Sequence, residues 1–447
     1  MFFWLKKATM REYSYLTLPM ENMSQQTVAV IGLGYVGLPL ALRASERGYQ
    51  VIGLDSSEKR IALLKEKQSP IPEERLIEQM KQFEFTPTTA PATLQEADII
   101  LICVPTPVDE MYYPDLTPVK EAATMAAKHL KKGALVVLES TVNPGVSEEV
   151  IQPILEAHGH AVGSDVYLAH CPERINPGDP KWNVSNIPRV VGATNSTGLE
   201  RSLDFYRSIV DGEIRPMKSI REAEAVKIVE NSFRDINIAF VNELARSFDV
   251  LGIDTKDVIE GAATKPFAFM PHFPSCGVGG HCIPVDPYYL IERAKQSGFD
   301  HRFLKIAREI NNQMPLYTVE LLQDALNEEK RALNGTTVGV LGLAYKANID
   351  DLRESPSLRI IKALQDHKAR VITYDPHVMS HSTETSLEAM LEKADCLILA
   401  TDHREFKTTL TPDLLKRYDI RVIIDGKNCL DKNAFQNAGL LYKGIGR

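Results

Sequence analysis

The chain has 447 residues, of which 44% are hydrophobic and 25% are charged, and its formal net charge at pH 7 is −8. This length exceeds one ordinary hydrophobic core and predicts two or three domains of a soluble globular protein. The acidic balance argues against a nucleic-acid or anionic-membrane partner, and no stretch is apolar enough to span a membrane. Six scattered cysteines without a CxxC pair or zinc spacing favour a reducing cytoplasm over a disulfide framework or a metal site.

Residues 1–25 are expected to form a disordered extension. The opening MFFWL is apolar but short, and Lys6 and Lys7 follow it instead of preceding it. A signal peptide is therefore not predicted.

The first folded segment has the order strand, glycine turn, helix, strand and acidic residue. A β-branched run passes into G-x-G-x-x-G at residues 32–37, and the second strand is closed by Asp55. This order is typical of a dinucleotide-binding unit, in which the glycines admit a pyrophosphate and the carboxylate accepts hydrogen bonds from both ribose hydroxyls. A 2′-phosphate would be repelled at Asp55, and Ser56 and Ser57 offer no positive charge, so NAD is favoured over NADP. The residues expected near the cofactor here are Gly32, Gly34, Tyr35, Val36, Gly37 and Asp55, with Arg60 as an outer contact.

Two further strands, 97–105 and 134–139, end at the edge where open α/β sheets bind their ligands. Pro105 and Thr106 close the first strand, and Thr141 follows the second. All three are candidate contacts to the cofactor. Roles in turns or caps fit the two threonines equally well.

A long helix is predicted from about Ser219 to about Leu251. Its apolar residues recur at spacings of three and four, which indicates a connecting spine between domains and a subunit contact, and so a homodimer. Lys227 and Asn231 lie four residues apart and share a face beside this stripe. A polar site would explain an asparagine inside a helix, and a solvated face is the alternative. The stripe consists of Val226, Val229, Phe233, Ile236, Phe240, Leu244 and Phe248.

The stretch CGVGGHCIPVDPYYL at 276–290 has three glycines before Cys282. Such a run predicts a tight loop where backbone comes close to a ligand. A thiol placed after it could be a nucleophile if its neighbours stabilise the thiolate, and a small buried apolar residue is an equally good interpretation. Asp286 and Pro287 look like the N-cap and first position of a helix, although a capping carboxylate can also face a pocket.

The last third restarts the α/β pattern, so the chain is a quasi-repeat with a second doubly wound sheet. Its first loop lacks the complete G-x-G-x-x-G and carries Lys346, which suits a diphosphate. The charged loop that follows, with Arg353, is interpreted in isolation as a solvated turn. The predicted fold is α/β, with two Rossmann-like domains joined by a long helix and a helical middle. The expected parts are the extension 1–25, an NAD-binding domain 26–215, a helical central and dimerisation domain 216–330, and a second Rossmann-like domain 331–447 for a different nucleotide.

In combination, these motifs resemble the UDP-glucose/GDP-mannose dehydrogenase family over about residues 27–440. The resemblance rests on GLGYVGLPLA, VPTP, EST, the spacing of Glu222, Lys227 and Asn231, GVGGHCIPVDP and YK…DDLRESP. CPER at 171–174 and HCIPVDPYYL look most like the branch that acts on UDP-N-acetylhexosamines. UDP-GlcNAc is the first choice of substrate and UDP-ManNAc the second.

The resemblance implies an NAD-dependent four-electron oxidation of the sugar 6-hydroxyl to a uronate that feeds surface polysaccharide synthesis. Cys282 would carry a thiohemiacetal and then a thioester, Lys227 and Asn231 would stabilise the oxyanion, and Lys227 would lower the pKa of the thiol. Asp286 or a water on Thr141 would transfer protons, and Glu173 would assist hydrolysis. Lys346 would contact the UDP side, and Arg353 the cofactor or a neighbouring subunit. The substrate-binding residues implied are Glu173, Arg174, Lys227, Asn231, Gly277, Gly279, Gly280 and Lys346.

Some residues depart from the family pattern. Pro177 stands where the UDP-glucose branch carries a second glutamate, and Cys276 is an extra thiol. For Glu173 and Arg174, taken alone, a surface ion pair is the plain interpretation. The competing functions are a UDP-glucose or UDP-GalNAc 6-dehydrogenase, a two-electron dehydrogenase of the hydroxyacid kind, and a non-catalytic NAD sensor. The last two leave the cysteine loop unexplained.

Overall fold

The computed structural model describes residues 26–71, 73–109, 112–175 and 181–447. The predicted extension 1–25 and Pro177 lie outside these residues. Contacts divide the chain into two units. The first runs up to Pro105 and includes Thr117–Ser140 and Gly145–Glu224, and the second comprises Thr106–Leu116, Thr141–Pro144 and Ala225–Arg447.

The first unit is built on an eight-stranded sheet with the order β3-β2-β1-β4-β5-β6-β7-β8. All neighbouring strands are parallel except β6 and β7. The strands are β1 Thr27–Ile31, β2 Gln50–Leu54, β3 Thr86–Thr88, β4 Ile99–Ile102, β5 Ala134–Leu138, β6 Val166–His170, β7 Arg189–Ala193 and β8 Ile214–Pro216.

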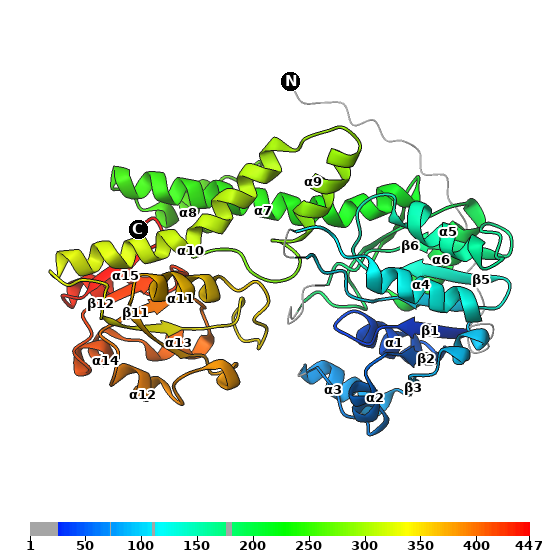
Figure 1. Cartoon of the computed structure of the whole chain (residues 1–447), viewed down its shortest axis with the longest axis horizontal. Helices are drawn as coiled ribbons and strands as arrows, with labels where there is room; N and C mark the ends of the chain where they lie inside the picture. The colour runs from blue at the N-terminus through cyan, green and yellow to red at the C-terminus, as the bar shows by residue number, and fades with distance from the viewer. Residues whose placement is uncertain (1–25, 72, 110–111, 176–180) are drawn as a thin grey trace. The chain divides into compact units, whose positions relative to one another are not determined.

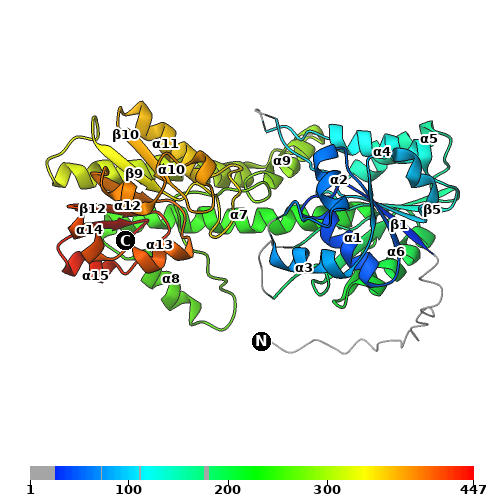
Figure 2. The same cartoon turned by 90° about the horizontal axis from the view of Figure 1, so that it is seen from below.

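Helices cover both faces of this sheet, which explains why its central strands are continuous apolar runs and not alternating ones. Helices α1 and α6 lie on one face and α4 and α5 on the other (Figure 2). The helices of this unit are α1 Gly37–Glu46, α2 Glu58–Lys65, α3 Glu74–Gln82, α4 Thr117–His129, α5 Gln152–Ala157 and α6 Ser196–Ile209.

The second unit contains the long helix α7, Ile220–Leu251, from Ala225 onward. Its sheet has the order β10-β9-β11-β12-β13 and is wholly parallel. The strands are β9 Thr337–Leu341, β10 Arg370–Tyr374, β11 Cys396–Leu399, β12 Val422–Asp425 and β13 Leu441–Gly444. The helices before the sheet are α8 Thr255–Ala263, α9 Asp286–Gln296 and α10 Arg302–Glu328.

Two hydrophobic clusters, one on each face, hold this second sheet. Helices α10 and α11 (Pro356–Asp366) pack on one face, and α12 (Leu387–Leu391), α13 (Arg404–Thr409) and α14 (Pro412–Arg417) on the other (Figure 1). The last helix, α15 (Lys432–Asn437), precedes β13. No helix in the described part of the chain has the length and hydropathy needed to cross a membrane.

The two sheets repeat the same local geometry, which confirms the predicted α/β fold with two Rossmann-like sheets. The Gly32 N–H donates to the Leu54 carbonyl at 2.8 Å, and the Gly342 N–H donates to the Tyr374 carbonyl at 2.9 Å. Both glycines have positive φ angles, +93° and +88°. The carboxylate at the end of the second strand accepts the next N–H in each case, from Leu33 to Asp55 and from Leu343 to Asp375.

Candidate active site

The glycine turn of the first unit brings the N-terminus of α1 to the end of β1. A Cβ atom on Gly37 would lie 1.8 Å from the Gly32 carbonyl oxygen, so only glycine fits there. A Cβ atom on Gly34 would meet nothing within 4 Å. No side chain caps α1, although the Leu38 N–H donates to the Gly34 carbonyl at 3.1 Å and Pro39 has no N–H. The positive end of the helix dipole therefore still points at the turn beside Gly34, where it favours an anion. This geometry fits the pyrophosphate of a dinucleotide.

Asp55 is buried at the end of β2, and its carboxylate already has three donors. Oδ2 accepts the Leu33 N–H at 2.9 Å and pairs with Arg60 at 2.8 Å, and Oδ1 accepts the Ser57 N–H at 2.9 Å. A carboxylate offers about four acceptor positions. Binding both ribose hydroxyls would therefore require Arg60 to move. Arg60 is a direct partner of Asp55, which the predicted outer contact did not anticipate.

The other predicted cofactor residues lie in the loops after β4 and β5. The Ser140 hydroxyl donates to the Val104 carbonyl at 2.7 Å and so ties these two loops together. Thr106 contributes its carbonyl oxygen, which accepts the buried Tyr289 hydroxyl at 2.6 Å. Thr141 is half-buried in the loop directly after this serine.

Glu173 is buried, so the interpretation as a surface ion pair with Arg174 is wrong. Its Oε2 pairs with Arg189 at 2.7 Å, and its Oε1 accepts the N–H groups of Arg174 and Ile175 at 2.6 Å. The Arg174 side chain instead donates to the Pro188 carbonyl at 2.9 Å. The sequence signal for Arg189 was a charged residue opening an apolar strand, and sequence reasoning did not use it.

The second unit brings Lys227, Asn231, Cys282 and Asp286 together. The Asn231 amide donates to Asp286 Oδ2 at 2.5 Å. Cys282 lies one turn before Asp286, whose N–H donates to the Cys282 carbonyl at 2.8 Å. Helix α9 begins at Asp286 without a side-chain cap, so the N-cap interpretation of this aspartate is wrong. Its carboxylate faces α7 instead.

The ionisable groups of this cluster have shifted pKa values. Burial raises the pKa of Asp286 to about 7, against the opposing effects of the Asn231 hydrogen bond and the Lys227 charge. Burial and the Asp286 charge raise the pKa of the Cys282 thiol to about 11, although Lys227, Arg353 and Arg234 act in the opposite direction. Lys227 lowers the thiol pKa as expected, but burial and the Asp286 charge raise it by more. In this state the thiol is protonated at neutral pH and needs a proton acceptor to react.

The three glycines before Cys282 make room for another segment of the chain. A Cβ atom on Gly279 would lie 2.6 Å from Tyr345 Cβ, and one on Gly277 would lie 3.0 Å from Pro356 Cβ. One on Gly280 would lie 2.8 Å from the Tyr345 ring, and the Gly280 N–H donates to the Arg353 carbonyl at 2.9 Å. The glycines thus seat the Cys282 loop (residues 275–285) against residues 345–356. This close contact between two loops explains why glycines stand at these positions. The predicted reason was the approach of a ligand.

The same contact brings the loop that carries the half-buried Lys346 and the exposed Arg353 beside the Cys282 loop. Arg353 is held by Asp351, with its Nε 3.0 Å from Oδ1. The additional thiol, Cys276, is fully buried. Its N–H donates to the Gly426 carbonyl at 2.8 Å and its Sγ to the Ala400 carbonyl at 3.4 Å. Cys276 therefore anchors the loop to the ends of β11 and β12.

A buried polar network that sequence reasoning missed supports the same loop from α7 and α10. The Asn242 amide oxygen accepts the Ser275 N–H at 3.0 Å, and its Nδ2 donates to Asn311 Oδ1 at 2.9 Å. Asn311 and Arg308 both donate to Asp235 Oδ1, at 2.7 and 2.5 Å. Repeated asparagines on apolar helix faces were the available signal, because buried amides need partners.

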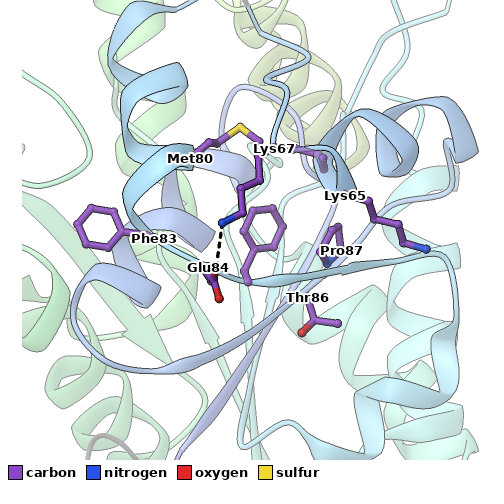
Figure 3. A pocket seen from close by; sticks show the side chains of 9 residues that line it. Lys65, Lys67, Met80, Phe83, Glu84, Thr86 and Pro87 are labelled. Atoms are coloured by element: carbon purple, nitrogen blue, oxygen red, sulfur yellow. Dashed lines mark hydrogen bonds and ion pairs between the residues drawn. The ribbon is translucent and has the colours of Figure 1, made fainter.

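Two other features of the described residues resemble sites but lack what a site needs. His377, His403 and Glu405 have ligand atoms within 4.8 Å of one another. His403 Nδ1 accepts the Asn348 N–H, and its Nε2 lies 3.0 Å from Asp375 Oδ2, so neither nitrogen is free for a metal. A hollow of about 380 Å³ beside the edge strand β3 contains the Lys67–Glu84 ion pair (Figure 3). None of the predicted site residues lines this hollow.

Family models match three successive segments. Residues 26–210 match the NAD binding domain of the UDP-glucose/GDP-mannose dehydrogenase family, residues 221–313 its central domain, and residues 339–432 its UDP binding domain. A UDP-N-acetyl-D-mannosamine dehydrogenase of Pyrococcus horikoshii is 36% identical, over 94% of this chain and 99% of the relative. A UDP-N-acetyl-D-glucosamine 6-dehydrogenase of Pseudomonas aeruginosa is 37% identical, over 90% and 98%.

Solved structures agree with these matches. The structure of UDP-D-ManNAc dehydrogenase from Pyrococcus horikoshii superposes with a TM-score of 0.89 at 35% identity, covering 94% of this chain and 99% of that one. The NDP-N-acetyl-D-galactosaminuronic acid dehydrogenase from Methanosarcina mazei superposes with a TM-score of 0.83 at 30% identity, covering 96% and 98%.

Proposed function

The chain belongs to the UDP-glucose/GDP-mannose dehydrogenase family, and on that premise we propose that it oxidises the C6 hydroxyl of a UDP-N-acetylhexosamine to the uronate. It is an NAD-dependent enzyme with an NAD-binding and a UDP-binding domain. The relatives named for the N-acetylmannosamine and N-acetylglucosamine sugars have nearly equal identity. UDP-GlcNAc remains the first choice and UDP-ManNAc the second.

The observation that carries the proposal is the cluster of Asn231, Asp286 and Cys282 beside Lys227. A dehydrogenase that stops at the aldehyde needs no thiol. A buried carboxylate with a pKa of about 7 and a neighbouring thiol supply the proton acceptor and the nucleophile that a second oxidation requires.

The residues act in a fixed order in this proposal. Asp286 takes the proton of the C6 hydroxyl, directly or through a water on Thr141, as the aldehyde forms. When bound, NAD would supply the hydride acceptor for each oxidation, and the reduced cofactor would be exchanged for a second NAD between the two. After Asp286 has released that first proton to water, Cys282 Sγ bonds to the aldehyde carbon and the thiol proton passes to Asp286, while Lys227 and Asn231 stabilise the oxyanion of the thiohemiacetal.

The second oxidation leaves a thioester on Cys282. Water attacks its carbonyl carbon with assistance from Glu173, the carbon–sulfur bond breaks, and the sulfur recovers a proton. Lys346 binds the UDP side of the substrate. The proposal also places Arg174, Gly277, Gly279 and Gly280 at the substrate and Arg353 at the cofactor.

A homodimer is part of the proposal. On α7 the side chains of Val229, Phe233 and Phe240 are exposed by 56%, 46% and 53%, although they belong to the apolar stripe of the helix. Their spacing of four and seven residues puts them on one side of the helix. An uncovered apolar stripe of this kind favours a second copy of the chain as its partner. Light scattering of Phe233→Glu and Phe240→Glu should report monomers if this is the interface.

The test of the activity is the NADH released per sugar consumed, with UDP-GlcNAc, UDP-ManNAc, UDP-GalNAc and UDP-glucose in parallel. About two NADH per sugar and an acid product on an N-acetylhexosamine would support the proposal and identify the sugar. About one NADH would favour a two-electron dehydrogenase. Bound NAD without any turnover would favour the sensor.

A further inference from the structure

A buried ionic cluster in the first unit surrounds Glu173. Arg189, the first residue of β7, reaches two carboxylates at once, with Nη1 2.9 Å from Glu139 Oε2 and Nη2 2.7 Å from Glu173 Oε2. The other oxygen of Glu139 accepts the hydroxyl of Tyr206 on α6. The Arg189 and Glu139 side chains have no exposed surface, and that of Glu173 is 8% exposed.

The two carboxylates differ in what holds them. Glu173 has two backbone N–H donors besides Arg189, so its orientation is fixed on both oxygens. Glu139 has Arg189 and one phenol. Glu139 and Glu173 together outnumber the single guanidinium, which leaves one excess negative charge away from water. Buried charge without a partner is costly, and the cluster relieves that cost by holding a proton.

The geometry requires an arginine. Its planar fork presents two N–H edges in fixed directions, so that each edge binds one carboxylate. A lysine offers a point charge that cannot bind both in this arrangement. Glu139 and Glu173 compete for one cation, and the charge state of one acts on the other through Arg189.

We propose that Arg189 and Glu139 are positioning residues for thioester hydrolysis: Arg189 fixes the Glu173 carboxylate, and the charge of Glu139 sets how strongly Glu173 activates the attacking water. This inference rests on the proposed function, which gives Glu173 its place in the hydrolysis. It adds two residues and a control on the step that releases the uronate.

The sign of the effect follows from the charges that face Glu139. These are Arg189, Glu173, Tyr206, Cys171 and Cys103. Burial raises the pKa of Glu139 to about 7, and Arg189 opposes the rise. Above that pH Glu139 places a second negative charge beside Arg189, so Glu173 no longer has the guanidinium charge to itself and activates the attacking water more strongly. Hydrolysis should therefore accelerate as the pH rises through about 7.

The test compares the full-length wild type with Glu139→Gln in single turnover with UDP-sugar and NAD. Glutamine keeps the shape and removes the excess charge, so this variant should fold at least as well as the wild type. The second phase of NADH release reports the second oxidation. The disappearance of the thioester adduct from the mass of the intact protein reports its hydrolysis. Asp211→Asn, which removes an exposed carboxylate paired with the buried Arg43 of the same unit, is the control.

In the wild type, hydrolysis should rise about 10-fold between about pH 6 and about pH 8. In Glu139→Gln it should stay at the low-pH rate while both NADH phases are retained, and Asp211→Asn should behave like the wild type. Arg189→Lys should lose at least about 10-fold in hydrolysis with little change in KM. Asp286 is intact in Glu139→Gln, so this variant tests Glu139 and not the proposed function. A pH profile of hydrolysis equal to that of the wild type would overturn this inference and leave the proposed function standing. A wild type that stops at one NADH would overturn the proposed function and this inference with it.

Discussion

Asn231 on α7 donates its side-chain amide to Asp286 Oδ2 at 2.5 Å, across 55 positions of the chain. The hydrogen bond stabilises the ionised carboxylate and so lowers the pKa of Asp286, which burial raises to about 7. This pair sets the pH range in which Asp286 can accept a proton.

Replacing Asn231 should move that range. In Asn231→Ala the donor is lost, the pKa of Asp286 rises above about 7, and the acidic limb of the kcat profile moves to higher pH. At pH 7 we expect kcat to fall by about 10- to 100-fold. Asn237→Ala is the control, because Asn237 lies on the same helix and donates to the Phe233 carbonyl. An acidic limb that stays in place would contradict the assignment of Asp286 as the acceptor.

The thiol should be required only for the second oxidation. Cys282→Ser should still bind NAD and release at most one NADH per sugar, because a hydroxyl is a far weaker nucleophile than a thiolate. Cys429→Ser is the control, since Cys429 is the other half-buried thiol in the described residues. Burst kinetics and intact mass would show the difference. Two NADH from Cys282→Ser would exclude the thioester route.

Removing the Asp286 charge should affect turnover and thiol reactivity in opposite directions. The Asp286 carboxylate raises the pKa of the Cys282 thiol, so Asp286→Asn should lower that pKa from about 11. Each unit gives about a tenfold larger thiolate fraction at any pH well below the pKa. Alkylation of Cys282 at about pH 8 should therefore become faster while kcat falls. Peptide mass spectrometry measures this with Cys429 as the internal reference, and slower alkylation would refute it.

Local patterns predicted the parts of the fold whose causes are local. The strand, glycine turn, helix and Asp55 of the first unit lie within 30 residues, and the structure reproduces them as β1, α1 and β2. The spacing of Lys227 and Asn231 also placed both on one helix. Strand β13 was missed because Leu441–Gly444 is short and only half apolar.

The site could be predicted only where its partners are close in sequence. Asp286 was interpreted as a cap because its true partner, Asn231, lies on another helix. Glu173 was paired with its neighbour Arg174, although Arg189 on a different strand holds it. The net pKa of Cys282 sums burial and charges from several segments, so no spacing rule could give its sign.

The fit of Gly279 against Tyr345 should make the Cys282 loop intolerant of a methyl group. In Gly279→Ala the Cβ would lie 2.6 Å from Tyr345 Cβ and 2.9 Å from the Glu354 carbonyl oxygen. We expect a loss of about 1–3 kcal/mol in the free energy of unfolding and a lower kcat. Gly261→Ala in α8 is the control, since its Cβ meets nothing within 4 Å and alanine favours a helix. Chemical denaturation measures both, and equal stabilities would contradict the close contact.

Arg60 and Asp55 together should decide between NAD and NADP. Arg60 is paired with Asp55 at 2.8 Å, and the carboxylate repels a 2′-phosphate. In Asp55→Ser the repulsion disappears and the freed guanidinium can bind that phosphate, as arginines do at such sites. We expect kcat/KM for NADP to rise relative to NAD by about 100-fold, chiefly because NAD loses a ribose contact. The double variant Asp55→Ser/Arg60→Ala separates the causes: it should lose the gain with NADP and keep the loss with NAD. If the ratio of kcat/KM for NADP to that for NAD is the same in the single and double variants, the arginine only neutralises Asp55 and takes no part in selecting the cofactor.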